Sequence, residues 1–131
     1  MMSLLFAAMI SGCSSLGMRD MTRQRCSSQL ATTAEKLENG SLTYEDLASL
    51  KIGESGFFYI LSNDGILLLH PHGALAGSDF SSIPSVKVMM SKEEGVQADE
   101  MGGVSRTVFF RRLSSGNILC LTVDTEELKG E

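Results

Sequence analysis

Arginine and aromatic side chains alternate along one short segment, and their types and spacing suit anion binding. In VSRTVFFRRL (residues 104–113), a strand period of two places Arg106, Phe110 and Arg112 on one face. A guanidinium group beside aromatic rings can hold a carboxylate out of water, because an anion buried without a cation or several donors is costly. The opposite face pairs Phe109 with Arg111, so either face has the residue types for such a contact; the alternative is a solvated strand face.

His70 is the second candidate group, because it ends the apolar sequence GFFYILSNDGILLLHP at residues 56–71. Pro71 cannot donate a sheet hydrogen bond, so the chain leaves the sheet there. The imidazole of His70 either stands at the rim of a cavity or bonds to the backbone of the next loop as a structural group. His72 is expected to be an exposed loop residue.

The sequence lacks the motifs of common enzymes. It has no Gly-x-Ser-x-Gly, no glycine-rich phosphate loop and no His-Glu-x-x-His. Asp99 and Glu100 are adjacent, so a strand points them to opposite sides and they form no catalytic pair. The cysteines and histidines do not cluster as metal ligands do. We therefore expect a protein without catalytic activity, cofactor or metal.

Composition narrows the class of partner. The chain has 131 residues, enough for one domain, and 43% of them are hydrophobic. Sixteen acidic residues outnumber eleven basic ones, which gives a net charge of −5. Because phosphate binding needs clustered lysine and arginine, this balance argues against a nucleic-acid partner.

Residues 1–13 predict an export signal or membrane segment, because an apolar run there precedes small residues. The string Ile-Ser-Gly-Cys at residues 10–13 resembles a bacterial lipobox, which makes Cys13 the expected site of lipid attachment. The alternatives are a membrane span over the uncharged residues 1–18 and a buried N-terminal helix. The lipobox and the span both predict an extracytoplasmic protein anchored to a bacterial membrane.

The remaining sequence divides into a helical region, residues 18–50, and a sheet-forming core, residues 51–131. Residues 18–38 have the spacing of a long helix. A second, short helix follows, with Thr43 as its N-cap and Asp46 three residues on, as in a capping box.

Five strands are predicted in the core: residues 57–61, 66–69, 96–101, 104–113 and 118–123. A helix at residues 83–94 separates the second from the third, and Asp124 is expected to cap a last helical turn. The fold class is α+β: a PAS-like five-stranded antiparallel sheet with a long N-terminal helix and short covering helices. Cys26 and Cys120 are expected to be a helix-face thiol and a strand thiol that do not meet; the alternative is a disulfide.

The hairpin sequence resembles the Cache family of extracytoplasmic sensor domains. Those domains read Gly-aromatic-x-aromatic, then aliphatic residues, an Asp and Gly turn, a second strand and His-Pro. The matching positions are Gly56, Phe57, Tyr59, Ile60, Leu61, Asp64, Gly65, His70, Pro71 and Gly77. The resemblance extends over about residues 30–128.

This resemblance implies non-catalytic binding of an amino acid or short carboxylate, for signalling or chemotaxis, in a pocket between the sheet and its covering helices. The expected ligand-binding residues are Tyr59, His70, Arg106, Phe110 and Arg112, with Arg106 and Tyr59 as the main binders. The helix at residues 18–38 can pair across a homodimer. Two alternatives stay open: a truncated sensor portion of a transmembrane chemoreceptor or histidine kinase, and a structural envelope lipoprotein with no ligand.

Overall fold

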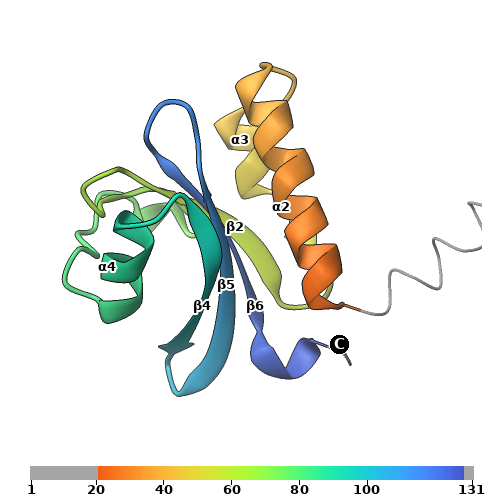
Figure 1. Cartoon of the computed structure of the whole chain (residues 1–131), viewed down its shortest axis with the longest axis vertical. Coiled ribbons are helices and arrows are strands. Elements are labelled where there is room, and N and C mark those ends of the chain that lie inside the picture. Colours follow the sequence, from red (N-terminus) through yellow and green to blue (C-terminus); the bar gives the residue numbers. More distant parts are fainter. Residues whose placement is uncertain (1–20, 129–131) are drawn as a thin grey trace, which may run out of the picture.

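In residues 21–128, the part of the chain that the structure describes, six strands form one sheet with helices on both faces (Figure 1). The structure is a computed structural model. The strands are β1 (Lys51–Ile52), β2 (Gly56–Leu61), β3 (Leu67–Leu69), β4 (Glu94–Met101), β5 (Val104–Arg112) and β6 (Ile118–Asp124). The helices are α2 (Arg23–Glu38), α3 (Tyr44–Ala48) and α4 (Pro84–Met90), with short 3-10 turns η1 (Gly73–Leu75) and η2 (Thr125–Glu127). The predicted lipobox, with Cys13, lies outside the described residues.

The sheet has the order β1-β2-β6-β5-β4, and every pair of strands is antiparallel. Both β1 and β3 pair with the edge of β2 that β6 leaves open. The last three strands pair consecutively, as their turn signals predict. The predicted α+β fold with a PAS-like antiparallel sheet is confirmed, and the two-residue β1 is an addition.

Side-chain caps set where α2 and α3 begin. The hydroxyl of Thr22 accepts the N–H of Arg25 at 3.1 Å, so α2 starts several residues later than predicted. Thr43 caps α3, and Asp46 completes the predicted capping box. None of the helices within residues 21–128 combines the length and apolar composition needed to cross a membrane.

The turn between β2 and β3 decides where His70 lies. The hydroxyl of Ser62 accepts the N–H groups of Asp64 (3.2 Å) and Ile66 (3.0 Å), and Gly65 adopts a φ of 86°. Only glycine takes such a positive φ without strain. The turn sends β3 back along β2, so His70, directly after β3, lies beside Phe57 and Tyr59 of β2.

Apolar side chains fill both sides of the sheet. The α2-side core contains Met21, Cys26, Leu30, Ala34, Leu47, Phe58, Ile60, Phe109, Leu113, Leu119, Leu121 and Val123. The α4-side core contains Tyr59, Leu61, Leu67, Val86, Met89, Val108, Phe110, Ile118 and Cys120. The adjacent Phe109 and Phe110 point to opposite cores, and each is only 1% exposed. A one-sided sheet could bury only one of them, whereas this sheet is covered on both faces (Figure 1).

The two-sided cover also separates the thiols. Cys26 belongs to the α2-side core and Cys120 to the α4-side core, with the sheet between them. No disulfide joins them, so the prediction that they do not meet is confirmed.

We expect Phe109→Ala and Phe110→Ala each to lower the free energy of unfolding by about 3–5 kcal/mol, because each opens a cavity in a closed core. Urea unfolding measures both values. Val104→Ala on the same strand is the control, since Val104 is 46% exposed and should change stability by less than about 0.5 kcal/mol. A near-neutral result for either phenylalanine would contradict two-sided burial.

Candidate functional site

Four aromatic and imidazole rings gather on the α4 side of the sheet, around Phe57 of β2. The ring centroid of Phe57 lies 5.1 Å from that of His70 and 6.4 Å from that of Tyr59. The rings of His70 and His72 stack with centroids 5.5 Å apart. Because Phe57 and Tyr59 are two residues apart, β2 presents both on one face, and the turn after β3 adds the imidazoles.

His70 is buried and bonds to the backbone. Its Nδ1 accepts the N–H of His72 at 3.0 Å, so the neutral ring carries its proton on Nε2. Burial, and then the neighbouring His72, lower the pKa of His70 below its ordinary value. His70 therefore bonds to the backbone of the next loop, as the structural alternative predicts. The ring accepts a backbone N–H in this bond. His72 is exposed, as predicted.

Arg106 of β5 also contacts Phe57. Its guanidinium carbon lies 5.2 Å from the ring centroid of Phe57, within range of a cation–π contact. Its Nε donates to Oγ1 of Thr122 (2.9 Å), Nη1 to Oδ1 of Asp124 (2.5 Å) and Nη2 to the carbonyl of Ser55 (3.0 Å). The guanidinium is therefore held in place, and its charge paired, by the chain itself.

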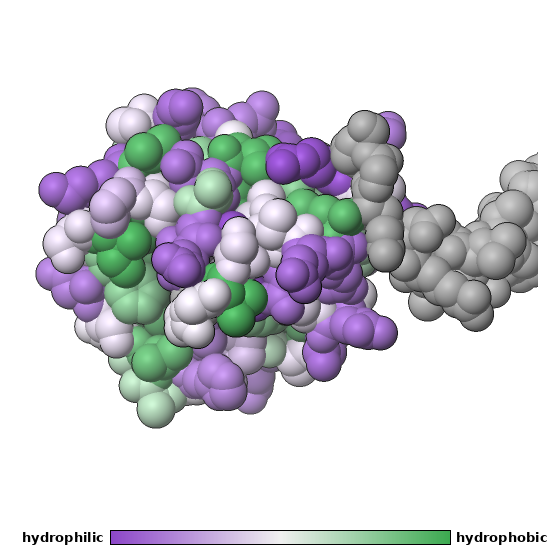
Figure 2. Space-filling model, turned by 90° about the horizontal axis from the view of Figure 1, so that it is seen from below, coloured by the Kyte–Doolittle hydropathy of each residue, from purple (hydrophilic) through white to green (hydrophobic). Residues whose placement is uncertain are grey.

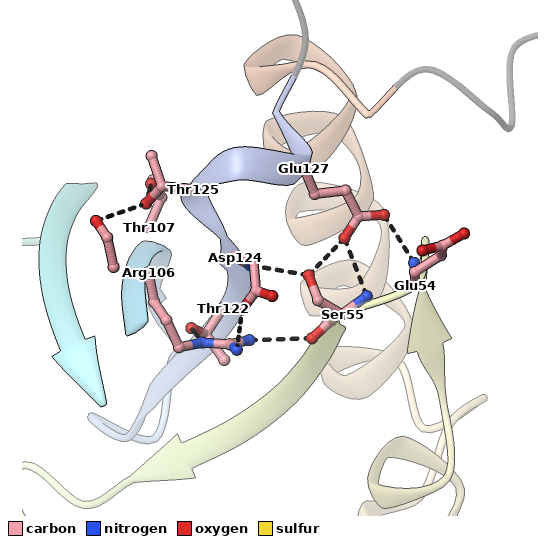
Figure 3. A network of polar contacts seen from close by, with 9 residues as sticks. Glu54, Ser55, Arg106, Thr107, Thr122, Asp124, Thr125 and Glu127 are labelled. Atoms are coloured by element: carbon pink, nitrogen blue, oxygen red, sulfur yellow. Dashed lines mark hydrogen bonds and ion pairs between the residues drawn. The ribbon is translucent and has the colours of Figure 1, made fainter. Parts of the chain in front are cut away.

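Ser55 connects Arg106 to the C-terminal turn η2 (Figure 3). The carboxylate of Glu127 accepts the N–H of Glu54 (2.7 Å), the N–H of Ser55 (2.9 Å) and the hydroxyl of Ser55. The same hydroxyl accepts the N–H of Asp124 at 2.8 Å. Burial disfavours the charged form of Glu127, but the donated bonds and the charge of Arg106 outweigh it and hold the pKa below its ordinary value.

The prediction that Asp124 caps a last helical turn is wrong. Its side chain caps no helical N–H, and only the single 3-10 turn η2 follows it. The register of β5 and β6 places Asp124 directly opposite Arg106, where the carboxylate makes a charge-assisted bond instead.

Arg112 lies at the opposite end of β5, six residues or about 20 Å from Arg106. It connects the end of α4 to two turns through hydrogen bonds from both Nη atoms. The acceptors are Oδ1 of Asn63 (2.8 Å) and the carbonyl oxygens of Gly116 (3.0 Å), Met90 (2.9 Å) and Lys92 (3.2 Å). These bonds fix the helix that covers the α4-side core.

The structure therefore brings together only part of the predicted site. Tyr59, His70 and Arg106 surround Phe57, whereas Phe110 packs inside the α4-side core and Arg112 stands at the far end of the strand. Phe57 was not among the predicted site residues, although the period of two that selected Tyr59 also selects it. Ser55, Asp124 and Glu127 were missed because their contacts depend on strand register and on partners more than sixty residues away.

A second surface feature lies at the end of the molecule where the described chain begins and finishes. That end shows hydrophilic residues interspersed with small hydrophobic groups (Figure 2). A groove of about 1060 Å³ there is lined by charges of both signs, among them Arg25, Lys51, Glu54 and Glu126. No group of three potential metal ligands is found in residues 21–128.

Solved structures identify the fold as that of Cache chemosensory domains. A Cache chemosensory domain studied for carboxylic acid recognition shares 18% identity, and the match covers 95% of this chain and 99% of that one with a TM-score of 0.54. The ligand-binding domain of Mlp24, solved with asparagine, shares 26% identity over 63% of this chain and 34% of that one, with a TM-score of 0.52. A methyl-accepting chemotaxis protein from Vibrio parahaemolyticus shares 10% identity over 78% and 82% of the chains, with a TM-score of 0.55.

These matches confirm the resemblance to the Cache family at the level of the fold. The match spans about a third of the length of several of these solved chains, including the Mlp24 domain. No protein-family model matches the sequence, and no curated protein sequence matches it significantly.

We expect Glu127→Gln to lower stability at pH 7 by about 1–2 kcal/mol, because a neutral amide accepts these bonds less strongly. The folded pKa of Glu127 is lowered, so its stabilising contribution is present above the ordinary value of 4.5 and is lost as pH falls through the folded pKa. The difference in stability between wild type and Glu127→Gln, measured by thermal unfolding, should therefore become smaller below about pH 4.5. Glu126→Gln, on the exposed neighbour, is the control; an equal effect there would contradict this role of Glu127.

Arg112→Gln should lower the free energy of unfolding by about 2 kcal/mol, because four acceptors lose a charged donor. Urea unfolding gives the value. Arg111→Gln is the matched control on the same strand, since Arg111 is exposed on the other face and its loss should be near neutral. Equal stability of the two variants would rule out Arg112 as the residue that holds the end of α4.

Proposed function

We propose that this chain is a non-catalytic, extracytoplasmic sensor module of the Cache type that binds an amino acid or a short carboxylate. One observation carries the proposal. A guanidinium group and four rings, contributed by β2, β5 and the turn after β3, converge on the α4 side of the sheet. Solved Cache domains of this fold include one described for carboxylic acid recognition and one solved with asparagine.

In the proposed complex, the ligand carboxylate binds Arg106 and the rings of Phe57 and Tyr59 pack against its carbon atoms. Arg106 must then exchange a partner, because Asp124 occupies its Nη1. The exchange is feasible because the side chain of Asp124 is 38% exposed and can return to water. The Nε and Nη2 bonds of Arg106 keep the guanidinium plane oriented meanwhile.

The membrane anchor belongs to the same proposal. Either lipid on Cys13 or a span over residues 1–18 would hold the sensor outside the cytoplasm, where it passes a signal for chemotaxis or another response. Lipid incorporation that Cys13→Ala abolishes would favour the lipoprotein over the sensor portion of a longer receptor or kinase.

A specific observation also favours a second candidate, a structural envelope protein that binds no ligand. The three donor nitrogens of Arg106 are already bonded within the chain, and Tyr59 is only 7% exposed. Such packing is what a scaffold with a filled core requires. The two candidates differ in whether any small molecule stabilises the fold.

We expect a thermal-shift screen of the twenty amino acids and short carboxylates to find compounds that raise the melting temperature by several degrees, because a ligand that binds only the folded state stabilises it. Arg106→Gln should abolish the shift relative to its own ligand-free melting temperature. Arg111→Gln should retain the shift, because that side chain lies on the opposite face of β5. If no compound shifts the wild type, the sensor proposal fails and the structural candidate stands.

A further inference from the structure

We propose that protonation of His70 releases the first part of the loop of residues 71–77, including the ring of His72 that stacks on His70, so that this part of the loop becomes mobile under acid conditions. The loop's change in order is a property of the chain alone. Any effect of this change on ligand access rests on the proposed function.

The proposal depends first on the hydrogen bond between the ring of His70 and the backbone of His72. Nδ1 of His70 must be unprotonated to accept the N–H of His72, which lies 3.0 Å away. The neutral ring already holds a proton on Nε2, so an added proton goes to Nδ1. Two donors then face each other, and the bond that ties this ring to the start of the loop is lost.

The surroundings of the ring add to this effect. His70 is only 6% exposed and packs against Phe57 and Tyr59, so its cation would lose hydration without gaining an anion. His72 stacks on it at 5.5 Å, and its proximity also disfavours the charged form of His70.

The charged groups near the cluster offer no compensation. Arg106 stands over the ring of Phe57, and its charge is already paired with Asp124, so neither group supplies an anion to His70. Asp99 of β4 and Arg106 both act on Tyr59, whose pKa is raised by burial, so its phenol is neutral. Within residues 21–128, neither histidine forms an ion pair with a carboxylate.

The far end of the loop is tied to β3, where the N–H of Leu67 donates to the carbonyl of Ser78 (2.8 Å), whereas the start of the loop has few contacts besides the His70 bond. Residues 71–77 are all exposed. Within the loop, the N–H of Leu75 donates to the carbonyl of His72 (2.9 Å) and that of Ala76 to Gly73 (3.1 Å), while the N–H of Gly77 reaches the carbonyl of Leu67 (2.7 Å). With few apolar contacts, such a segment opens locally long before the domain unfolds.

The test is an NMR titration of the 131-residue chain without ligand, from about pH 7.5 to about pH 5. Ring nitrogen shifts report the protonation of His70, and hydrogen exchange at Leu75 and Ala76 reports the order of the loop. Once corrected for the intrinsic pH dependence of exchange, protection should fall roughly fivefold with the same midpoint as His70, below its ordinary value of 6.5.

Three variants distinguish the effect of protonating His70 from the effect of losing its packing contacts. His70→Asn keeps an acceptor two residues before the same N–H, as in an Asx turn, but does not titrate, so protection should persist at low pH. His70→Ala should lose protection at every pH. His72→Gln removes the stacked ring and should move the midpoint upward.

Two results would overturn the proposal: unchanged loop protection while the ring of His70 titrates, or the same acid-dependent loss in His70→Asn. Because no ligand is present, these results leave the thermal-shift screen unaffected. A failed screen likewise leaves the loop measurement valid.

Discussion

Cover on both faces of β2, β5 and β6 is the constraint on which the other features of this protein depend. Side chains on either face of these strands lie among apolar neighbours, so a polar group there needs a partner inside the protein. Thr122 accepts from Arg106, Thr107 pairs with Thr125, and His70 bonds to the loop backbone. Bonded polar side chains therefore lie near the ends of the strands, where the turns supply hydrogen-bond partners.

Under the proposed function, Arg106 would have two roles that compete. As a structural residue it joins the start of β2, the end of β6 and, through Ser55, the C-terminal turn. As a candidate binding residue it must give up part of that bonding. A ligand bound to Arg106 would therefore act on the attachment of the C-terminal turn without touching it, because Ser55 bonds both Arg106 and Glu127.

Local patterns predicted most elements of this fold, but they missed the two-residue β1 and continued the α4 helix to residue 94, where β4 begins instead. Thr43 and Asp46 cap α3 as their spacing indicates, and Asp64-Gly65 turns the first hairpin. The alternation along residues 104–113 assigned Arg106 and Phe110 to one face, which the α4-side core confirms for Phe110. These features depend on neighbours within a few residues, which is the range over which a sequence pattern carries information.

The candidate site was predicted less completely, because strand pairing decides it. Asp124 meets Arg106 only through the register of β5 and β6, and Glu127 meets Ser55 across more than seventy residues. Likewise, alternation alone cannot show that Arg112 faces the carbonyl groups at the end of α4. A sequence gives the face of a strand to which a side chain belongs, but not the neighbour that it meets there.

The bridge between Met21 and Leu128 brings the first and last described residues side by side. Paired backbones lie only about 5 Å apart, a gap that one exposed loop of another protein can span without distortion. The ends of the described fold are therefore close enough for the whole fold to be inserted into a loop of another protein. Grafted at a single position, it would leave the architecture of its host intact on either side of the junction.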